Sequence, residues 1–233
     1  MNRSPVETIL FLLMAGIFIL TVPAWAQPQQ ATPLLVVDPG HGGTDGGVKI
    51  NERYQEKDAT LAIASLLQNE LARSAAVTVQ LTRQADRLMT TSERRKAVRA
   101  LQPALFISLH VNGGFGKRSS GYEVYFPGFG SKGSGGGGTT EILKDMVRNK
   151  YLNESVRLAQ SLQRNLEDVF PRKGRGLREA PIPILEGLAM PAVVVEIGFA
   201  TNPEDRAKIM NDKTQRAIAQ ALSRAVLEYL NNR

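Results

Sequence analysis

Cysteine is absent from the 233 residues of this sequence, and histidine is nearly absent. Without cysteine the chain can form no disulfide, no thiolate metal site and no cysteine nucleophile. The two histidines, His41 and His110, are the only imidazole groups that the chain offers for metal binding or proton transfer. Any such chemistry must therefore use one or both of them.

The sequence also lacks an apolar run of the roughly 20 residues that a membrane-spanning helix needs. Its longest apolar run extends from Ile9 to Val22, about 14 residues, between the positive charge of Arg3 and the small-x-small pattern of Ala24–Ala26. This combination is typical of a secretory signal peptide, and it favours cleavage over retention as a membrane anchor. We therefore predict a signal peptide over residues 1–26 and an exported protein, periplasmic or extracellular.

The remaining residues are enough for one α/β domain with a good core. We expect a linker over residues 27–33 and a single catalytic domain over residues 34–233, acting as a monomer. The net charge is +7, and removing residues 1–26 leaves it unchanged because Arg3 and Glu7 cancel. A basic balance favours an anionic partner. Anionic lipid, an anionic wall polymer and nucleic acid are the candidates, and a basic surface that only keeps the protein soluble is the alternative. After export nucleic acid fits least well, so we expect no nucleic-acid partner.

Apolar runs alternate with segments of helical periodicity along most of the chain. Runs rich in β-branched residues predict strands at Leu34–Val37, Val77–Leu81, Ala104–Leu109, Tyr122–Phe126 and Ala192–Val195. Amphipathic spacing predicts helices at Glu56–Leu71, Ser92–Leu101, Thr139–Arg148, Glu154–Val169 and Lys213–Leu230. The alternation predicts an α/β fold, with an open, mostly parallel sheet that carries helices on both faces.

A glycine-rich stretch interrupts this alternation. Residues 127–138 read PGFGSKGSGGGG, which predicts a flexible segment. We treat residues 127–153 as an insert in the domain. Further along, the basic segment Arg172–Arg178 is expected to be a loop.

Both histidines follow predicted buried strands. In open α/β sheets, ligands bind at the edge formed by the carboxyl ends of the strands. One histidine there would be an ordinary, partly buried residue, but here both histidines of the chain share that edge. Neutral imidazole is the commonest protein ligand of zinc. The positions of His41 and His110, rather than a short spacing motif, therefore indicate a metal site.

A glycine-rich loop and two acidic residues accompany the histidines. His41 lies in DPGHGGTDGG, whose five glycines let the backbone bend sharply beside a bound group. Glu56 opens the helix after this loop, where it could also simply complement the helix dipole. Glu196 follows four apolar residues of a strand, where a carboxylate is costly unless it is paired with an arginine or bound to metal. Both carboxylates are therefore candidate site residues.

Five stretches together resemble the zinc-dependent N-acetylmuramoyl-L-alanine amidases, the family of cell-separation amidases. The stretches are LLVVDPGHGGTDGG at 34–47, EKD at 56–58, LTRQAD at 81–86, LFISLHVNG at 105–113 and MPAVVVEIGFATNPED at 190–205. They occur in the order and spacing of the family. Each stretch alone is a weak signal, whereas the combination is specific.

The resemblance implies a six-stranded sheet and one zinc ion per chain, with His41, Glu56 and His110 as ligands and Glu196 as the catalytic carboxylate. It also implies hydrolysis of the amide between N-acetylmuramic acid and L-alanine of peptidoglycan, in wall remodelling or cell separation. Three protein ligands would leave zinc one open position for water, whose pKa zinc lowers toward about 7. Glu196 would accept the proton of that water and pass it to the leaving amine.

Two positions depart from the family pattern: Val111 stands where alanine is usual, and Glu186 stands where arginine is frequent. Two other functions stay open as alternatives. One is a zinc carboxypeptidase-like amidohydrolase acting on wall peptides, and the other is a catalytically inactive wall-binding protein. The products distinguish them, because an amidase frees the amino end of L-alanine, a carboxypeptidase releases D-alanine and a binder releases nothing.

The insert allows one further hypothesis. Some amidases of this family carry, in the corresponding region, a helix that blocks the zinc site until an activator moves it. By that resemblance Glu141 could occupy the open zinc position, or the apolar face of the helix could dock a protein activator or recruiter. The alternative is a surface loop without such a role.

Overall fold

The computed structural model describes residues 31–128 and 139–232, and Thr32–Arg233 form one compact unit. The predicted signal peptide and most of the predicted linker lie outside the described residues, as do residues 129–138 of the insert. In the part of the chain that the structure describes, no helix is both long enough and apolar enough to cross a membrane.

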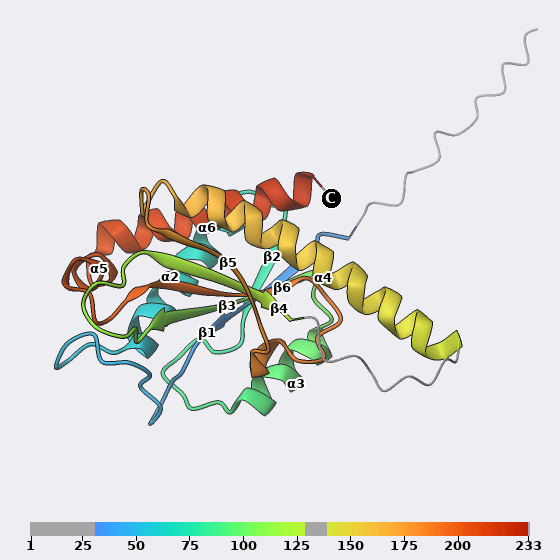
Figure 1. Cartoon of the computed structure of the whole chain (residues 1–233), viewed down its shortest axis with the longest axis horizontal. Helices are drawn as coiled ribbons and strands as arrows, with labels where there is room; N and C mark the ends of the chain where they lie inside the picture. The colour runs from blue at the N-terminus through green and yellow to red at the C-terminus, as the bar shows by residue number, and fades with distance from the viewer. Residues whose placement is uncertain (1–30, 129–138, 233) are drawn as a thin grey trace, which may run out of the picture. The chain divides into compact units, whose positions relative to one another are not determined.

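The described residues of this unit form six strands and five α-helices (Figure 1). The strands are β1 (Leu34–Pro39), β2 (Thr78–Leu81), β3 (Leu105–Asn112), β4 (Tyr122–Pro127), β5 (Gly174–Ala180) and β6 (Ala192–Phe199). The helices are α2 (Glu56–Ala72), α3 (Thr91–Leu101), α4 (Thr139–Leu166), α5 (Pro203–Ile209) and α6 (Asp212–Asn231), together with a 3-10 turn, η1 (Pro183–Leu185).

The strands form one open sheet in the order β2-β1-β3-β6-β4-β5. Four of the five neighbouring pairs are parallel, and only β4 with β6 is antiparallel. The open, mostly parallel sheet of six strands is therefore confirmed. Because β4 and β5 run opposite to the other strands, their carboxyl ends lie at the amino ends of β1, β3 and β6.

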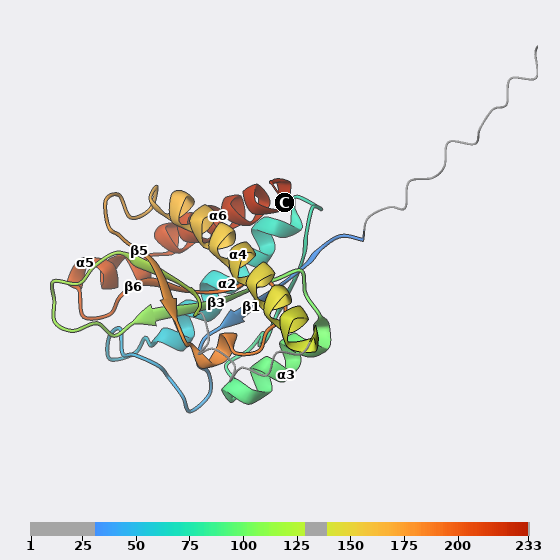
Figure 2. The same ribbon diagram turned by 45° about the vertical axis from the view of Figure 1, so that its right-hand side comes forward.

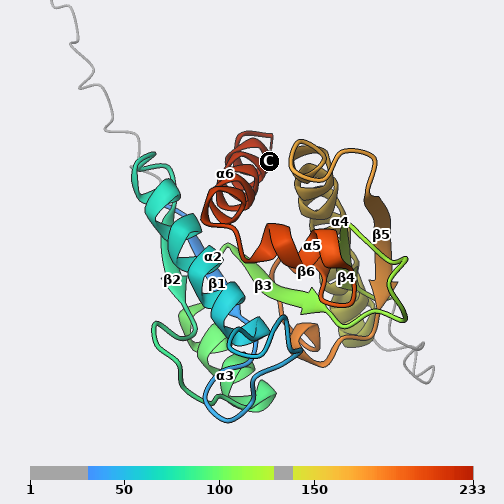
Figure 3. The same cartoon turned by 90° about the vertical axis from the view of Figure 1, so that its left-hand side faces the viewer.

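Helices cover both faces of the sheet, as predicted. α2, α4 and α6 pack together over one face, above a large core that includes Leu35, Leu109 and Val195. α3 and η1 cover part of the other face, above a smaller core around Val36, Phe106 and Val194. Figure 3 shows α4 and α6 on one side of the sheet and α3 on the other. Since side chains alternate along a strand, residues 106, 108 and 110 of β3 all point to the α3 face.

The region after β4 differs from the sequence prediction. We predicted two helices with a break over residues 149–153, but α4 is one helix of 28 residues. Neither glycine nor proline occurs between Thr139 and Leu166. The helix also contacts the sheet just after the expected break, where the Ser155 hydroxyl accepts a hydrogen bond from the Ala192 amide at 2.9 Å. Packing against the start of β6 therefore continues the helix.

The position of α4 also bears on the blocking hypothesis. The contact between Ser155 and Ala192 places this part of the helix at the amino end of β6. Glu196 lies four residues further along β6, toward the opposite edge. Figures 1 and 2 show the first turns of α4 running away from the loop that carries His41. The side chain of Glu141 lies outside the described side chains, so its role at the metal site stays a prediction.

The predicted basic loop at Arg172–Arg178 was also wrong in part. Residues from Gly174 onward form β5, the strand at one edge of the sheet. Its sequence, GRGLREA, lacks the apolar run that marks the buried strands, because an edge strand is covered on fewer sides. Leu177 alone packs against the core from this strand. Pairing with β4 therefore defines a strand that hydrophobic periodicity could not reveal.

Candidate metal centre

His41 stands immediately after β1, at the carboxyl edge of the sheet. It has a positive φ of 61°, which is uncommon for a residue with a side chain. Its Nδ1 lies 2.9 Å from Oδ2 of Asp45, within the same glycine-rich loop. A carboxylate on Nδ1 leaves Nε2 free to point at a metal, which is the usual orientation mechanism for ligating histidines. Asp45 is thus a residue of the site that the sequence prediction did not single out.

Glu56 is the first residue of α2, as predicted, and it lies between the two histidines. Its Oε1 is 3.1 Å from Nε2 of His41 and 2.9 Å from Nδ1 of His110. Its position is fixed further by the amides of Val48 and Val111, which donate to Oε2 and Oε1. The side chain is buried. The carboxylate therefore joins the loop, the helix and β3 at one point.

The three residues form a compact donor set. One ligand atom from each of His41, Glu56 and His110 lies within 4.8 Å of the other two, and among the described residues this is the one such group of histidines and carboxylates. The two imidazole rings meet edge to face, with centroids 5.1 Å apart. Two nitrogens and one carboxylate oxygen at this separation suit a small tetrahedral ion with one open position. The donor set fits zinc.

The pKa values of His41 and Glu56 are shifted in the directions that favour a positive charge between them. The hydrogen bond to Glu56 raises the pKa of His41 to about 9, although burial opposes the rise, and Asp45 adds to it. Burial acts to raise the pKa of Glu56, but its contacts with His110 and His41 outweigh burial and lower it to about 2. Glu56 is therefore a carboxylate at neutral pH. A metal ion would replace the imidazole protons, so binding would release protons.

Glu196 lies beside the donor set on the next strand. It is the register partner of His110 between β3 and β6, so both side chains are on the α3 face of the sheet. Its Oε2 is buried and has no hydrogen-bond partner among the described residues. Burial raises the pKa of this carboxyl to about 7. An unpaired carboxyl with such a pKa, next to a metal site, is suited to take up and release a proton.

Two buried arginines hold the loop of His41 in place. Arg83 is the largest fully buried side chain, and it donates to the carbonyls of Pro39 and Gly40 at 3.0 Å each. Arg94, on α3, donates to Asp38 at 2.7 Å and to the His41 carbonyl at 2.5 Å. Buried carbonyls need partners, and here guanidinium groups supply them. These two arginines position His41, a candidate metal ligand, by binding backbone carbonyls rather than its ring nitrogens.

Two glycines are required by close approach to the ligands. A Cβ on Gly40 would lie 2.5 Å from the His110 ring. A Cβ on Gly47, whose φ is +66°, would lie 2.4 Å from Oε2 of Glu56 and 2.7 Å from the His41 ring. Both distances are far below van der Waals contact. The glycine content noted in the sequence therefore reflects the space that the ligands occupy.

A second buried carboxylate, Glu123, continues the row of polar residues across the sheet. It is the register partner of Glu196 between β4 and β6. Tyr125 donates to it, and burial together with this bond raises the pKa of Tyr125 to about 12. Its other partners are Asn112, Arg175 and Arg178. The sequence prediction missed Glu123, which is hidden in the aromatic strand YEVYF.

The two departures from the family pattern have simple structural settings. Val111 is buried in the core below the site, and its amide donates to Glu56. The Glu186 side chain is exposed and pairs with Arg95 at 2.8 Å.

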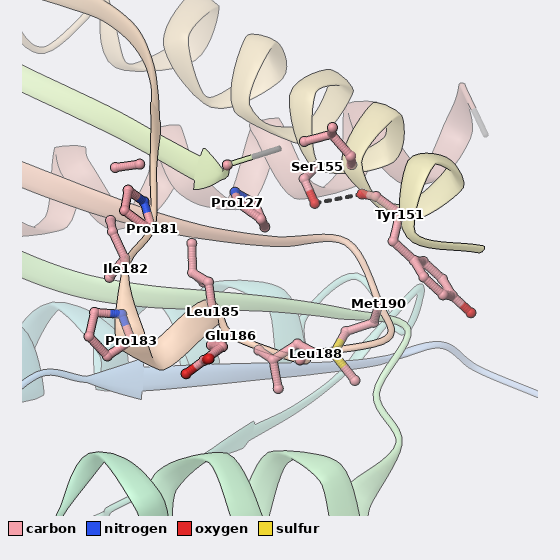
Figure 4. A pocket seen from close by; sticks show the side chains of 14 residues that line it. Pro127, Tyr151, Ser155, Pro181, Ile182, Pro183, Leu185, Glu186, Leu188 and Met190 are labelled. Carbon is pink, nitrogen blue, oxygen red and sulfur yellow. Dashed lines mark hydrogen bonds between the residues drawn. The ribbon is translucent and has the colours of Figure 1, made fainter. Parts of the chain in front are cut away.

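A pocket lies at the opposite edge of the sheet. It has a volume of about 480 Å³ and is lined mainly by apolar side chains, including Leu152, Leu185 and Met190 (Figure 4). Pro127 and Ala180 also line it, which places it at the amino ends of β1, β3 and β6. None of the metal-site residues takes part. This pocket is therefore separate from the candidate metal centre.

A His-Glu-His group that could hold a metal ion, beside a buried carboxyl at the carboxyl edge of an open α/β sheet, is an arrangement suited to a metal-dependent hydrolase. The family model for N-acetylmuramoyl-L-alanine amidases matches residues 35–228. The chain therefore belongs to that family, as its motifs had indicated, and it is an amidase of peptidoglycan.

The chain is similar to an uncharacterized protein and to two proteins named as N-acetylmuramoyl-L-alanine amidases. The chain is 30% identical to the protein YqiI of Bacillus subtilis, over 94% of this chain and 95% of the relative. It is 25% identical to the N-acetylmuramoyl-L-alanine amidase AmiA of Escherichia coli, over 85% of this chain and 76% of the relative. An N-acetylmuramoyl-L-alanine amidase structure from Clostridium difficile matches with a TM-score of 0.72 and 29% identity, covering 87% of this chain and 98% of that one.

Proposed function

We propose that this amidase is zinc-dependent, with His41, Glu56 and His110 as the ligands and Glu196 as the group that moves the proton. The observation that carries the proposal is the convergence of the three ligand atoms within 4.8 Å, next to a buried and unpartnered carboxyl oxygen of Glu196. The amide that is cut joins N-acetylmuramic acid to L-alanine. The reaction would serve wall remodelling or cell separation.

The residues of the chain have separate tasks in this reaction. Bound zinc supplies Lewis-acid chemistry, polarising the scissile carbonyl and acidifying a water. Asp45 keeps the Nδ1 proton on His41, so that Nε2 is presented as a neutral donor. Glu196 takes the proton of the attacking water and delivers it to the nitrogen of L-alanine as the amide bond breaks. The carbonyl carbon gains the hydroxyl, and the peptide leaves with a free amino group.

The test combines metal analysis with product analysis on purified peptidoglycan. We expect one zinc per chain, loss of turnover on chelation, and peptides that begin with free L-alanine. Glu196→Gln should keep zinc and lose about 10²- to 10⁴-fold in turnover, the usual contribution of a general acid–base group. His110→Ala should lose zinc and turnover together.

Glu204→Gln is the matched control, because Glu204 is an exposed carboxylate paired with Lys173 at the surface. It should behave as the native enzyme. Full zinc occupancy in His110→Ala would remove the ligand assignment, and normal turnover in Glu196→Gln would remove the proton role. Release of D-alanine would instead favour the carboxypeptidase alternative, and absence of products would favour the wall-binding one.

The site of action follows from the substrate, which lies outside the cytoplasm. We propose export by means of the signal peptide predicted over residues 1–26, since the apolar run of residues 9–22 ends at a small-x-small pattern. Sequencing of the exported protein should find Gln27 as the first residue. An exported protein that retains Met1 would show an anchor instead.

A further inference from the structure

Two arginines on the edge strand β5 meet the buried carboxylate of Glu123. Nε of Arg175 lies 2.9 Å and Nε of Arg178 lies 3.2 Å from Oε1 of Glu123. Oε2 of Glu123 accepts from Tyr125 at 2.8 Å and from Asn112 at 3.0 Å. Glu123 is only 4% exposed, so both its oxygens are fully occupied by protein groups.

The charges in this cluster do not balance. Two guanidinium groups share one carboxylate, which leaves a surplus of one positive charge. In the described structure each arginine uses Nε for Glu123, and no hydrogen bond or ion pair involves the terminal nitrogens of either one. Their side chains are 39% and 43% exposed. Four terminal NH₂ groups in a half-open position are thus available for a planar anion.

Neighbouring groups restrict how these arginines move. The guanidinium of Arg175 stacks over the Phe199 ring at 5.3 Å from its centroid. Arg178 is in register with Tyr125, whose hydroxyl is bound to the same Glu123. Because the donors are already oriented, an anion would lose less entropy on binding them than on binding free lysines.

The distance to the metal site suits a peptide. Neighbouring strands are about 4.8 Å apart, so β5 lies roughly 10 Å from β6, which carries Glu196. The arginines reach back to Glu123 on β4, about one strand spacing from Glu196. An extended peptide advances about 3.3 Å per residue, so this separation corresponds to one to three residues. His110, Glu196 and Glu123 are in register, so the path runs over one face of the sheet.

We propose that Arg175 and Arg178, oriented by Glu123, form a subsite for a carboxylate of the stem peptide, one to three residues beyond the scissile amide. This inference rests on the proposed function, because that function places the scissile amide beside Glu196. A peptide offers free carboxylates, whereas the N-acetylated sugar on the other side of the amide offers neutral groups. The subsite therefore fixes which way the substrate lies across the sheet.

The test uses two soluble muropeptides that differ only at the peptide carboxylate, one free and one amidated. Native enzyme should cleave the free form with the lower KM and with a similar kcat. Arg178→Gln and Arg175→Gln should raise KM for the free form roughly 10- to 100-fold, the range for charged hydrogen bonds. Neither variant should change KM for the amidated form, so the preference should disappear.

Arg172→Gln is the control for charge alone. It removes the same charge just before β5, and no hydrogen bond or ion pair of its guanidinium occurs in the described structure, so it should keep the native preference. Arg178→Lys keeps a charge for Glu123 but not the planar pair of donors, and it should keep the fold with an intermediate KM. This variant tests the proposal even if Arg178→Gln folds poorly.

Two results would overturn the subsite, and they are separable from failure of the proposed function. Equal KM values of the native enzyme for the two muropeptides would show that the carboxylate is not bound. If Arg178→Lys raises KM equally for both muropeptides, Arg178 has a structural role only. If native, zinc-loaded enzyme cleaves neither muropeptide at the sugar–alanine amide, the proposed function fails and the subsite falls with it.

Discussion

The two edges of the sheet differ in the side chains that line them: buried charged groups at one edge and apolar groups at the other. At the carboxyl ends of β1, β3 and β6, charged side chains that are themselves buried hold the loops, with Arg83 and Arg94 bound to backbone carbonyls. At the opposite edge, apolar side chains surround a pocket of about 480 Å³. The sheet and the helices are common to both edges, so the loops and their supports account for the difference.

This difference shows what a metal site requires of its surroundings. The ligands must be presented by a tight loop, whose carbonyls are cut off from water and need donors. Each buried donor in turn needs a partner, as Arg94 has in Asp38 at 2.7 Å. The apolar edge has no such requirement, because nothing there must be held within a fraction of an ångström. Substitutions at the edge that carries the histidines should therefore lower zinc affinity and stability far more than matched substitutions at the apolar edge.

The largest contrast is expected between two glycines, one at each edge. Gly40→Ala would place a methyl group 2.5 Å from the His110 ring, so the ligand must turn or the loop must move. Displacing a ligand in this way should lower zinc affinity by at least about 10- to 100-fold, as changes around metal ligands do. Gly128→Ala, at the other edge, meets its nearest atom at 3.4 Å, an ordinary contact.

Zinc titration and turnover on peptidoglycan measure both variants. Gly128→Ala should match the native enzyme in each measurement. Native zinc affinity in Gly40→Ala would mean that the histidine edge is more adaptable than this comparison assumes.

The next prediction concerns the buried ion pair between Arg94 and Asp38, which holds the loop of His41. Arg94→Met keeps the length of the side chain but leaves Asp38 buried without its cation. Breaking a buried pair from one side typically costs about 3–5 kcal/mol. In a chain of this size each kcal/mol lowers the Tm by about 2–4 °C. The His41 carbonyl also loses its donor, so zinc affinity should fall as well.

Denaturant unfolding and zinc titration give the two readouts for Arg94→Met. The double variant Arg94→Met with Asp38→Asn removes the uncompensated charge and should recover part of the stability. If it instead recovers nothing, the loss comes from the carbonyls of Pro39 and His41 rather than from Asp38.

Much of the metal-site edge could be predicted from the sequence, because its signals are local. His41 and His110 follow apolar runs that mark buried strands, and strand ends meet at one edge. Glu56 and Glu196 stand at positions where a carboxylate is easy to notice. The structure brings these three candidate ligands together and sets Glu196 beside them. The roles of the four residues stay predictions until the variants are measured.

The supports of the site could not be predicted in the same way. Arg83 and Arg94 are two of 29 basic residues, and nothing in their local sequence marks them as buried. Their roles depend on contacts with residues more than 40 positions away along the chain. The same holds for β5 and for the continuity of α4, since strand pairing and packing against the sheet decide both. Where a structure is decided by distant contacts, local patterns carry little information.

The smallest effect is expected from an arginine–carboxylate pair that matches the buried one in distance but is exposed. Arg95 follows Arg94 in the sequence and pairs with Glu186 at 2.8 Å, against 2.7 Å for Arg94 with Asp38. The side chain of Glu186 is 76% exposed, whereas that of Asp38 is 1% exposed. Glu186→Gln should therefore change the free energy of unfolding by at most about 1 kcal/mol, since water screens the charge that remains. The change should vanish in about 1 M salt, where screening acts over about 3 Å, and zinc affinity should stay native.

Denaturant unfolding of Glu186→Gln and Arg94→Met, each at low and at high salt, measures the contrast between the exposed and the buried pair. A loss of several kcal/mol in Glu186→Gln would show that distance rather than burial sets the strength of these pairs.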